Sequence, residues 1–297
     1  MHTKKNLKVP FVSVVVCTYN RKNLLSACLN SIYAQENANF EVIVVDGGST
    51  DGTEELCKEF PEIRFIVESR FGLAYARNKG AELALGSIVA YTDDDCIVDK
   101  RWLRHLIAGF QFSENIMGVG GPVYPLRPKM IPEKIYVKAA LGLFDDGERA
   151  RLTEGIITSN SAFKREIFKT IEFDETLGIT RQGGLVLAGE DTDFCREIVK
   201  SGYKLMYTPQ AKVYHQIQKK RIKVTYITKR ALHSGISKAR IFVKEKQSRI
   251  WAIRFALGQL IQHILKIPFD TSFTSCYNLL HYGSALFISL TGLDIIL

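Results

Sequence analysis

The first hundred residues alternate short β-branched segments with segments of helical periodicity. Continuous apolar runs bounded by polar residues predict buried strands at 12–16, 41–45, 63–67 and 88–92. The segments between them begin near residues 22, 51 and 72, and they repeat apolar side chains at helical spacing. Such alternation with short turns is typical of βαβ units. We therefore predict an α/β fold in which a mostly parallel central sheet is flanked by helices.

This alternation stops near residue 112, and the pattern becomes less regular. Residues 121–134 contain four of the eight prolines, which excludes a regular helix or a central strand there. Further patterns predict a strand at 156–160, a short helix at 164–170, a glycine-bearing loop at 178–189, a helix at 191–200, and strands at 204–208 and 212–215. From about residue 223 to the end the pattern is helical.

Charge is distributed unevenly along the chain. The whole chain has a net charge of +9, but fifteen Lys and Arg residues and a single acid, Glu245, lie between Lys204 and Lys266. Two interpretations of this basic region remain open: a solvated helical appendage, and peripheral contact of the amphipathic segment 251–265 with an anionic membrane. Residues 272–293 reach spanning length but contain too many polar residues for a membrane span. Nucleic acid is not a predicted partner, because no recognition motif accompanies the charge.

Cysteine usage indicates a reducing compartment. The six cysteines form no CxxC pair and no cluster with zinc-type spacing, and they lie in apolar segments where a free thiol behaves as a small hydrophobe. Residues 9–17 are interpreted as a strand rather than as part of a signal peptide. We therefore expect reduced thiols and a cytoplasmic protein, with the inner face of the membrane as the alternative location.

Polar residues follow three of the predicted strands. Thr18, Tyr19 and Asn20 follow the first strand, Asp46 and Gly47 end the second, and Asp93, Asp94 and Asp95 end the fourth. Each group alone is explained by a turn or a helix cap. In an open parallel sheet, however, ligands bind beyond the carboxyl ends of the strands, where the strand order reverses. We therefore expect these groups to converge in one site.

The three successive aspartates suggest a cation. Adjacent carboxylates repel one another, and Mg²⁺ or Mn²⁺ relieves this repulsion while bridging carboxylates to substrate phosphates. Arg77 and Asn78, in the first turns of a helix that Gly72 opens, could bind a diphosphate. The alternatives are a solvated acidic turn and a surface arginine.

With these motifs in order, the chain resembles a family 2 glycosyltransferase with the GT-A fold. The resemblance covers about residues 10–216, and it rests on SVVVCTYNR (13–21), VVDGGSTDGT (44–53), GLAYARNKG (72–80), YTDDDC (91–96), SNSAFKRE (159–166), GEDTDFCREI (189–198) and VYHQ (213–216). It implies a catalytic domain at 1–218, with a nucleotide-sugar half at about 10–115 and an acceptor half at about 116–218. A basic, partly amphipathic helical region would follow at 219–297.

The resemblance also implies roles for the polar residues. Asp46 would bind the base or ribose of a nucleotide sugar, Thr18 and Tyr19 would line the nucleoside site, and Arg77 would touch the diphosphate. The predicted donor site comprises Thr18, Tyr19, Asn20, Asp46, Gly47, Arg77, Asn78, Asp93 and Asp94. The predicted ligands of Mg²⁺ or Mn²⁺ are Asp93, Asp95 and His215, although His215 could instead be structural. Lys219, Arg221 and Arg230 are further candidates to bind a donor diphosphate or a lipid-linked phosphate.

Glu190 and Asp191 resemble the acidic pair that supplies the catalytic base in this family. Inverting transfer needs one base near the acceptor hydroxyl and no covalent intermediate, and a carboxylate at a helix N-terminus stays ionised. We favour Asp191 over Glu190, with Asp193 as a lesser candidate. The alternative is that the pair only caps a helix.

The predicted function is metal-dependent transfer of a sugar, with inversion, from a nucleotide diphosphate sugar to a hydroxyl acceptor in polysaccharide or glycoconjugate synthesis. A UDP-sugar is the favoured donor, GDP- and dTDP-sugars are alternatives, and a lipid-linked acceptor is one option. Two other functions remain open: an inactive module that binds sugar nucleotides or membrane surfaces, and a nucleotidyltransferase of similar fold. The latter should show a glycine-rich loop after the first strand, where this chain has Thr18-Tyr19-Asn20-Arg21.

Overall fold

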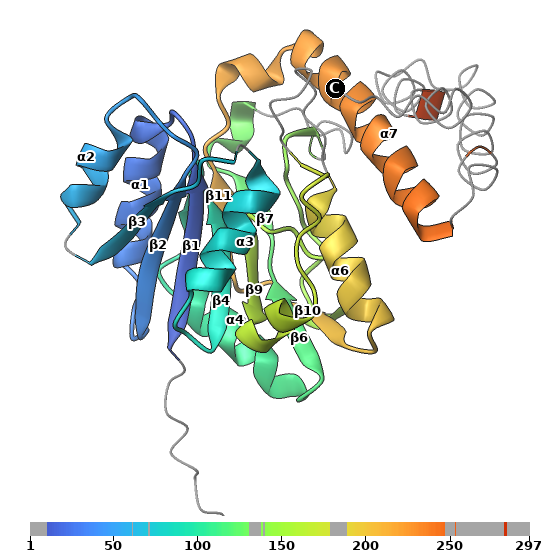
Figure 1. Cartoon of the computed structure of the whole chain (residues 1–297), viewed down its shortest axis with the longest axis horizontal. Coiled ribbons are helices and arrows are strands. Elements are labelled where there is room, and N and C mark those ends of the chain that lie inside the picture. The colour runs from blue at the N-terminus through green and yellow to red at the C-terminus, as the bar shows by residue number, and fades with distance from the viewer. Residues whose placement is uncertain are drawn as a thin grey trace, which may run out of the picture.

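The computed structural model describes residues 11–60, 62–70, 72–130, 138, 140–178, 189–246, 253 and 282–283 (Figure 1). Several features predicted from the sequence fall largely outside the described residues. They are the segments 251–265 and 272–293, most of the loop 178–189, and Cys276.

A mixed eight-stranded sheet forms the centre of the molecule, with the strand order β3-β2-β1-β4-β9-β6-β10-β8. Within it, β9 and the edge strand β8 run antiparallel to their neighbours, and the other pairs are parallel. The strands are β1 Val12–Thr18, β2 Phe40–Asp46, β3 Ile63–Val67, β4 Ile88–Asp93, β6 Ile116–Gly120, β8 Arg151–Thr153, β9 Asn160–Lys164 and β10 Lys204–Tyr207. The predicted mostly parallel sheet is confirmed.

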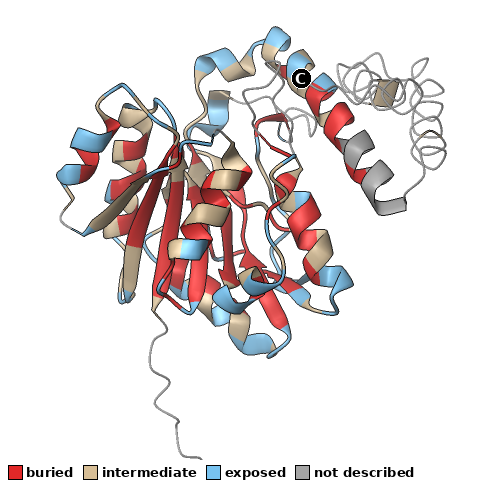
Figure 2. Cartoon of the chain, viewed as in Figure 1, coloured by how far each residue is buried: buried red, intermediate tan, exposed pale blue. Residues whose placement is uncertain are grey.

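Helices cover both faces of this sheet because successive side chains of its strands point to opposite faces. In β1, Val14 and Val16 pack on one side and Val15 on the other. The first face is covered by α1 Lys22–Tyr33, α2 Thr53–Lys58 and α4 Trp102–Gly109. The second is covered by α3 Leu73–Leu83, the 3₁₀ helix η3 Arg165–Lys169 and α6 Glu190–Lys200. Buried residues are concentrated in the central strands and the inner helix faces (Figure 2).

A small three-stranded sheet lies beside the large one, in the order β5-β11-β7. It comprises β5 Cys96–Val98, β7 Val123–Pro125 and β11 Val213–His215. His215 pairs with Cys96 in the antiparallel β5–β11 ladder, and the Gln216 amide donates a 2.7 Å hydrogen bond to the carbonyl of Asp95. This ladder brings the end of β11 next to the acidic turn after β4, although 120 residues separate them in sequence.

The part of the C-terminal region that the structure describes packs against earlier parts of the chain. It contains the 3₁₀ helix η5 Lys219–Ile222 and the long helix α7 Val224–Lys246. Ile227 of α7 packs on Ala140 and Leu141. Further along, α7 passes beside α6 (Figure 1), and an added Cβ on Gly189 would lie 2.7 Å from Cδ1 of Ile241. No helix within the described residues is long and apolar enough to cross a bilayer.

The later part of the fold differs from the sequence prediction. The strand predicted at 156–160 is wrong, because the strand there is β9 at Asn160–Lys164, and it runs antiparallel between β4 and β6. The short strands β5, β6, β7 and β8 were not predicted. In β6, Gly118 and Gly120 weaken the apolar pattern, but an added Cβ would lie 2.7 Å from Leu205 and 2.6 Å from Ile156 respectively. Close packing therefore requires glycine at both positions, and the same glycines are the reason that the sequence pattern did not predict this strand.

Five of the six cysteines lie within the described residues, and all five are free thiols: Cys17, Cys28, Cys57, Cys96 and Cys195. This agrees with the prediction of reduced cysteines.

Candidate active site

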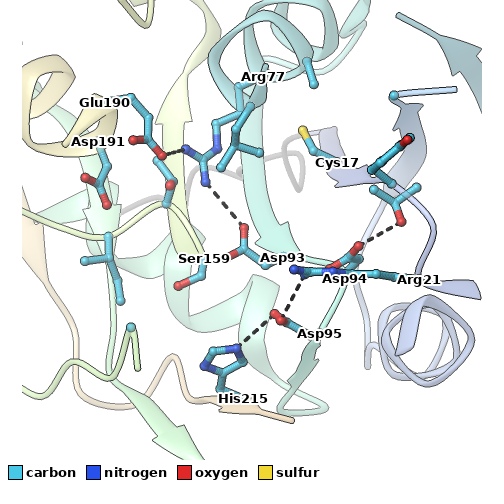
Figure 3. A pocket seen from close by; sticks show the side chains of 18 of the residues that line it. Cys17, Arg21, Arg77, Asp93, Asp94, Asp95, Ser159, Glu190, Asp191 and His215 are labelled. Carbon is cyan, nitrogen blue, oxygen red and sulfur yellow. Dashed lines mark hydrogen bonds and ion pairs between the residues drawn. The ribbon is translucent and has the colours of Figure 1, made fainter. Parts of the chain in front are cut away.

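A cavity of about 510 Å³ opens at the carboxyl ends of β1 and β4 (Figure 3). The chain builds β2 and β3 on one side of β1 and then places β4 on the other, so the strand order reverses between β1 and β4. This is the position at which open α/β sheets bind ligands. The lining includes Thr18, Arg77, the aspartates 93–95, the acidic pair Glu190 and Asp191, and His215. The structure therefore gathers most of the predicted site residues in one pocket.

Asp94 is buried at the end of β4 and is held from the β1 side. The Thr18 hydroxyl donates to it at 2.8 Å, and the Arg21 guanidinium donates to its other oxygen at 2.8 Å. Burial raises the pKa of Asp94 to about 6, although the charge of Arg21 opposes the shift. Arg21 was not predicted as a site residue, but its position directly after Thr18-Tyr19-Asn20 was a usable signal.

Asp95 is surrounded by cationic groups. His215 Nε2 lies 3.1 Å from one carboxylate oxygen, and the guanidinium groups of Arg221 and Arg21 lie 3.1 and 3.2 Å from the other. Burial alone would raise the pKa of Asp95, but the hydrogen bond from His215 and the charges of Arg221 and Arg21 outweigh it and hold the pKa well below its usual range. Asp95 is therefore ionised, which a carboxyl group must be in order to bind a metal cation.

Arg77 connects the acidic turn to the acidic pair. Its side chain is buried, and it donates to Glu190 at 2.8 Å and to Asp93 at 3.4 Å (Figure 3). Glu190 lies 113 residues further along the chain. The backbone carbonyl of Arg77 accepts a hydrogen bond from the Tyr91 hydroxyl, and the Phe173 ring lies under the guanidinium at 5.6 Å. The burial of Asp93 raises its pKa, against the attraction of Arg77.

Glu190 and Asp191 begin α6 on the far side of the pocket from β1. Gly189 precedes them with φ 106°, a left-handed conformation that favours glycine. One oxygen of Glu190 binds Arg77, and the other is buried without a hydrogen-bond partner among the described residues. Burial and the neighbouring charge of Glu190 raise the pKa of Asp191 to about 6, against the attraction of Arg77. The two carboxyls of the pair thus differ: Glu190 is held in an ion pair with Arg77, whereas Asp191 forms no ion pair with a described residue and has a raised pKa.

The remaining predicted donor residues lie differently. Tyr19 and Gly47 line the pocket, but Asp46 is buried and accepts hydrogen bonds from the amides of Gly48 and Ser49, which shapes its own turn. The Asn20 side chain accepts from the Thr50 amide at 2.8 Å. The Asn78 side chain donates to the Phe173 carbonyl and accepts from its amide, both at 2.9 Å. Asp46, Asn20 and Asn78 are absent from the described lining, so their contact with a donor stays a prediction.

The basic residues of the C-terminal region are partly in the pocket. Arg221 and Arg230 line it, as does Lys220 rather than the predicted Lys219. Residues after the predicted boundary at 218 therefore contribute to the pocket, and the boundary itself stays a prediction.

Of the predicted cation ligands, Asp95 and His215 lie next to each other, with His215 Nε2 3.1 Å from one oxygen of Asp95. Within the described residues, no group of three or more His, Cys, Asp or Glu side chains is placed to hold a metal ion, and Asp93 is directed to Arg77 rather than to His215. The second ring nitrogen of His215, Nδ1, is buried without a partner. Mg²⁺ and Mn²⁺ commonly take one or two protein ligands and complete their shell with phosphate and water. Asp95 and His215 are of the right chemical type for this mode of binding, but a cation bound between them would replace the contact of His215 Nε2 with Asp95 and compete with Arg221.

The model of the family described as "Glycosyl transferase family 2" matches residues 13–172. The chain belongs to this family. A glucosyl-dolichyl phosphate glucuronosyltransferase of Haloferax volcanii is 29% identical over 239 residues, which span 76% of each chain. A dolichyl N-acetyl-alpha-D-glucosaminyl phosphate glycosyltransferase of Methanococcus voltae, which adds a diacetamido-dideoxy-glucuronosyl group, is 23% identical over 267 residues, or 86% of this chain and 81% of the relative.

Among solved structures, the fold is similar to that of a mannosyltransferase from Pyrobaculum calidifontis in complex with GDP-mannose and Mn²⁺. The two structures align with a TM-score of 0.61 and 21% identity, over 97% of this chain and 75% of that one. These findings confirm the predicted family, the GT-A fold, and glycosyl transfer from a nucleotide sugar in glycoconjugate synthesis. They also exclude the nucleotidyltransferase alternative.

Proposed function

We propose that this glycosyltransferase inverts the sugar it transfers, with Asp191 as the catalytic base and Asp95 and His215 as ligands of Mg²⁺ or Mn²⁺. The observation that supports this most directly is the arrangement of carboxylates in the pocket. Asp93–Asp95 lie at the end of β4, the pair Glu190–Asp191 lies at the start of α6, and Arg77 connects the two groups. The pocket thus has separate places for a donor and for a base.

On the donor side, the chain offers fixed polar groups at the carboxyl ends of β1 and β4. Thr18 and Arg21 hold Asp94 in place, so the acidic turn is organised before a ligand arrives. Tyr19 and Gly47 line the part of the pocket next to this turn, where we place the nucleoside. A bound divalent cation at Asp95 and His215 would neutralise the charge that develops on the leaving diphosphate.

On the acceptor side, Asp191 removes the proton from the attacking hydroxyl. A base is most effective when its pKa lies near the working pH, and a pKa of about 6 leaves Asp191 largely ionised at neutral pH while making it a stronger base than an ordinary aspartate. Glu190 serves a different purpose because Arg77 holds it in an ion pair. We assign it a positioning role at the start of α6.

The substrates of the relatives suggest the class of acceptor. Both archaeal relatives are named for dolichyl phosphate-linked sugars, and we propose a lipid-linked acceptor for this chain as well. It would reach the pocket through peripheral contact with a membrane surface. For the donor, the solved structure of similar fold binds GDP-mannose. We therefore propose GDP-sugars as candidate donors together with the UDP-sugars predicted from the sequence.

The base assignment is tested by Asp191→Asn, which keeps the shape of the side chain but removes its basicity. We expect turnover to fall by about 10²–10⁴-fold, with unchanged binding of the donor nucleotide in the presence of Mn²⁺. The control is Glu197→Gln on the same helix, where the half-exposed side chain pairs with Lys200, and its turnover should match that of the unaltered protein. Undiminished turnover in Asp191→Asn would refute this assignment.

A further inference from the structure

One wall of the pocket is basic. It is formed by η5 and the first turns of α7, and it contributes Gln218, Lys220, Arg221, Tyr226 and Arg230 to the lining. Arg221 is already engaged, because it binds Asp95 at 3.1 Å and contacts His215 at 3.1 Å. Lys220 and Arg230, by contrast, form no ion pair with any carboxylate of the described chain.

Most of the other charged groups of the pocket are held in ion pairs; among the lining carboxylates, Asp191 forms none with a described residue. Arg70 pairs with Glu68, Arg21 with Asp94, and Arg77 with both Asp93 and Glu190. Lys220 and Arg230 are therefore the lining cations that no described carboxylate holds in an ion pair. Unpaired cations that line a cavity attract an anionic ligand group.

The course of α7 places Arg230 between the two functional sides of the pocket, and Lys220 lies on η5 just before this helix. The helix begins next to η5, which carries Arg221 to Asp95, and by Ile241 it has reached Gly189, the residue before the acidic pair. Arg230 lies between these points, roughly 9 Å along the axis from Val224 at 1.5 Å per residue. Tyr226 and Arg230 are four residues apart, so they share one face of α7, and Lys229 is exposed outside the lining.

We propose that Lys220 and Arg230 form a subsite for the phosphate group of a phosphorylated acceptor. The inference rests on the proposed function, in which the donor diphosphate is bound near Asp95 and His215. A guanidinium can bind a phosphate through two parallel hydrogen bonds and an ammonium adds a point charge. The phosphate could belong to a lipid-linked sugar or to a soluble sugar phosphate, since both present the same charged group.

The subsite is tested by calorimetric titration of the full chain, saturated with Mn²⁺ and with the nucleoside diphosphate that binds it best. Octyl phosphate is the anionic probe and octyl glucoside is the neutral one. We expect octyl phosphate to bind and octyl glucoside to bind at least tenfold more weakly. Lys220→Gln and Arg230→Gln should each weaken octyl phosphate binding at least tenfold, because each removes a charge-assisted contact.

Matched controls are Lys223→Gln and Lys229→Gln, which remove exposed cations outside the lining of the pocket. Both should bind octyl phosphate as the unaltered chain does. Glucose 1-phosphate distinguishes the two sources: equal binding of both phosphates supports a soluble acceptor in the subsite, and preference for octyl phosphate supports a lipid-linked one.

Two results would overturn the inference. One is unchanged affinity for octyl phosphate in Lys220→Gln and Arg230→Gln. The other is a loss of affinity for the nucleoside diphosphate in these variants, because that would show that the two cations bind the donor. If no nucleoside diphosphate binds the unaltered chain, the proposed function fails, and titration of the unsaturated chain with octyl phosphate still decides on the subsite.

Discussion

Arg77 determines how the two carboxylates of the acidic pair differ. It donates a hydrogen bond to Glu190 and none to Asp191, so Glu190 is held in an ion pair, while burial and the charge of Glu190 raise the pKa of Asp191. Two adjacent carboxyl groups thereby acquire different roles from their surroundings. The sequence resemblance gives Arg77 a role at the donor diphosphate. The structure adds a role at Glu190, because the same guanidinium reaches both sides of the pocket.

The raised pKa of Asp191 predicts a pH dependence of turnover. A base is active only when deprotonated, so kcat should rise as the pH passes through about 6 and level off above pH 7. The measurement is kcat from pH 5 to pH 9 with saturating donor and acceptor. Turnover that stays constant between pH 5 and pH 7 would contradict the assignment.

Replacing Arg77 by Met should destabilise the protein strongly. The change leaves Glu190 as a buried carboxylate without its cation, and breaking a buried ion pair from one side costs about 3–5 kcal/mol. Urea unfolding monitored by circular dichroism measures the loss. The matched control is Arg70→Met, which removes the exposed partner of Glu68 and should lower the free energy of unfolding far less. Equal losses in the two variants would show that burial of Arg77 is not the cause.

At the scale of elements, the three successive aspartates at the end of β4 form hydrogen bonds and ion pairs with residues of three different parts of the fold. Asp93 is the last residue of the strand, and side chains alternate direction there. Asp94 and Asp95 lie in the turn that follows, where the chain changes direction. Asp93 faces Arg77 of α3, Asp94 faces Thr18 and Arg21 after β1, and Asp95 faces His215 of β11. Each carboxylate therefore ties a different element to the pocket.

The close approach of α3 to β1 depends on Gly80. A Cβ at this position would lie 2.3 Å from Cγ1 of Val15, in a fully buried contact. Gly80→Ala should therefore destabilise the protein by about 1–3 kcal/mol, measured as the free energy of unfolding in urea. Gly155→Ala is the control, because an added Cβ there meets no atom within 4 Å. A neutral Gly80→Ala would mean that α3 moves away from the sheet without cost.

At the scale of the whole molecule, Asn160 connects the large sheet to the small one. Its amide nitrogen donates to the carbonyls of Pro122 and Ala211, which precede β7 and β11, and its oxygen accepts from the indole of Trp102 in α4. All three bonds are buried. This side chain thus helps to hold the small sheet, and with it His215, beside the large one.

Asn160→Ala should cost at least about 2 kcal/mol of unfolding free energy, because it leaves the Trp102 indole and two carbonyls buried without partners. The loss is measured by urea unfolding. Asn115→Ala, at an exposed position before β6, is the control and should change stability by less than about 0.5 kcal/mol. If the two variants unfold at the same urea concentration, the link between the sheets is not important for stability.

The sequence alone determined the first half of the fold and the chemical nature of the site. Strands β1 to β4 and helices α1 to α3 were predictable because each buries a continuous or periodic apolar face, which is a local property of the chain. The aspartates at 93–95 and the pair Glu190–Asp191 were predictable because they directly follow or begin such elements.

Tertiary structure decided the rest. Three features join residues that are distant in sequence. Strand β9 inserts antiparallel between β4 and β6, Asn78 binds Phe173, and Arg77 pairs with Glu190. Local periodicity shows which face of an element is buried, but it does not show which partner covers that face. The partner is fixed only when the whole chain packs, because hydrogen bonds and ion pairs depend on distances between side chains in space.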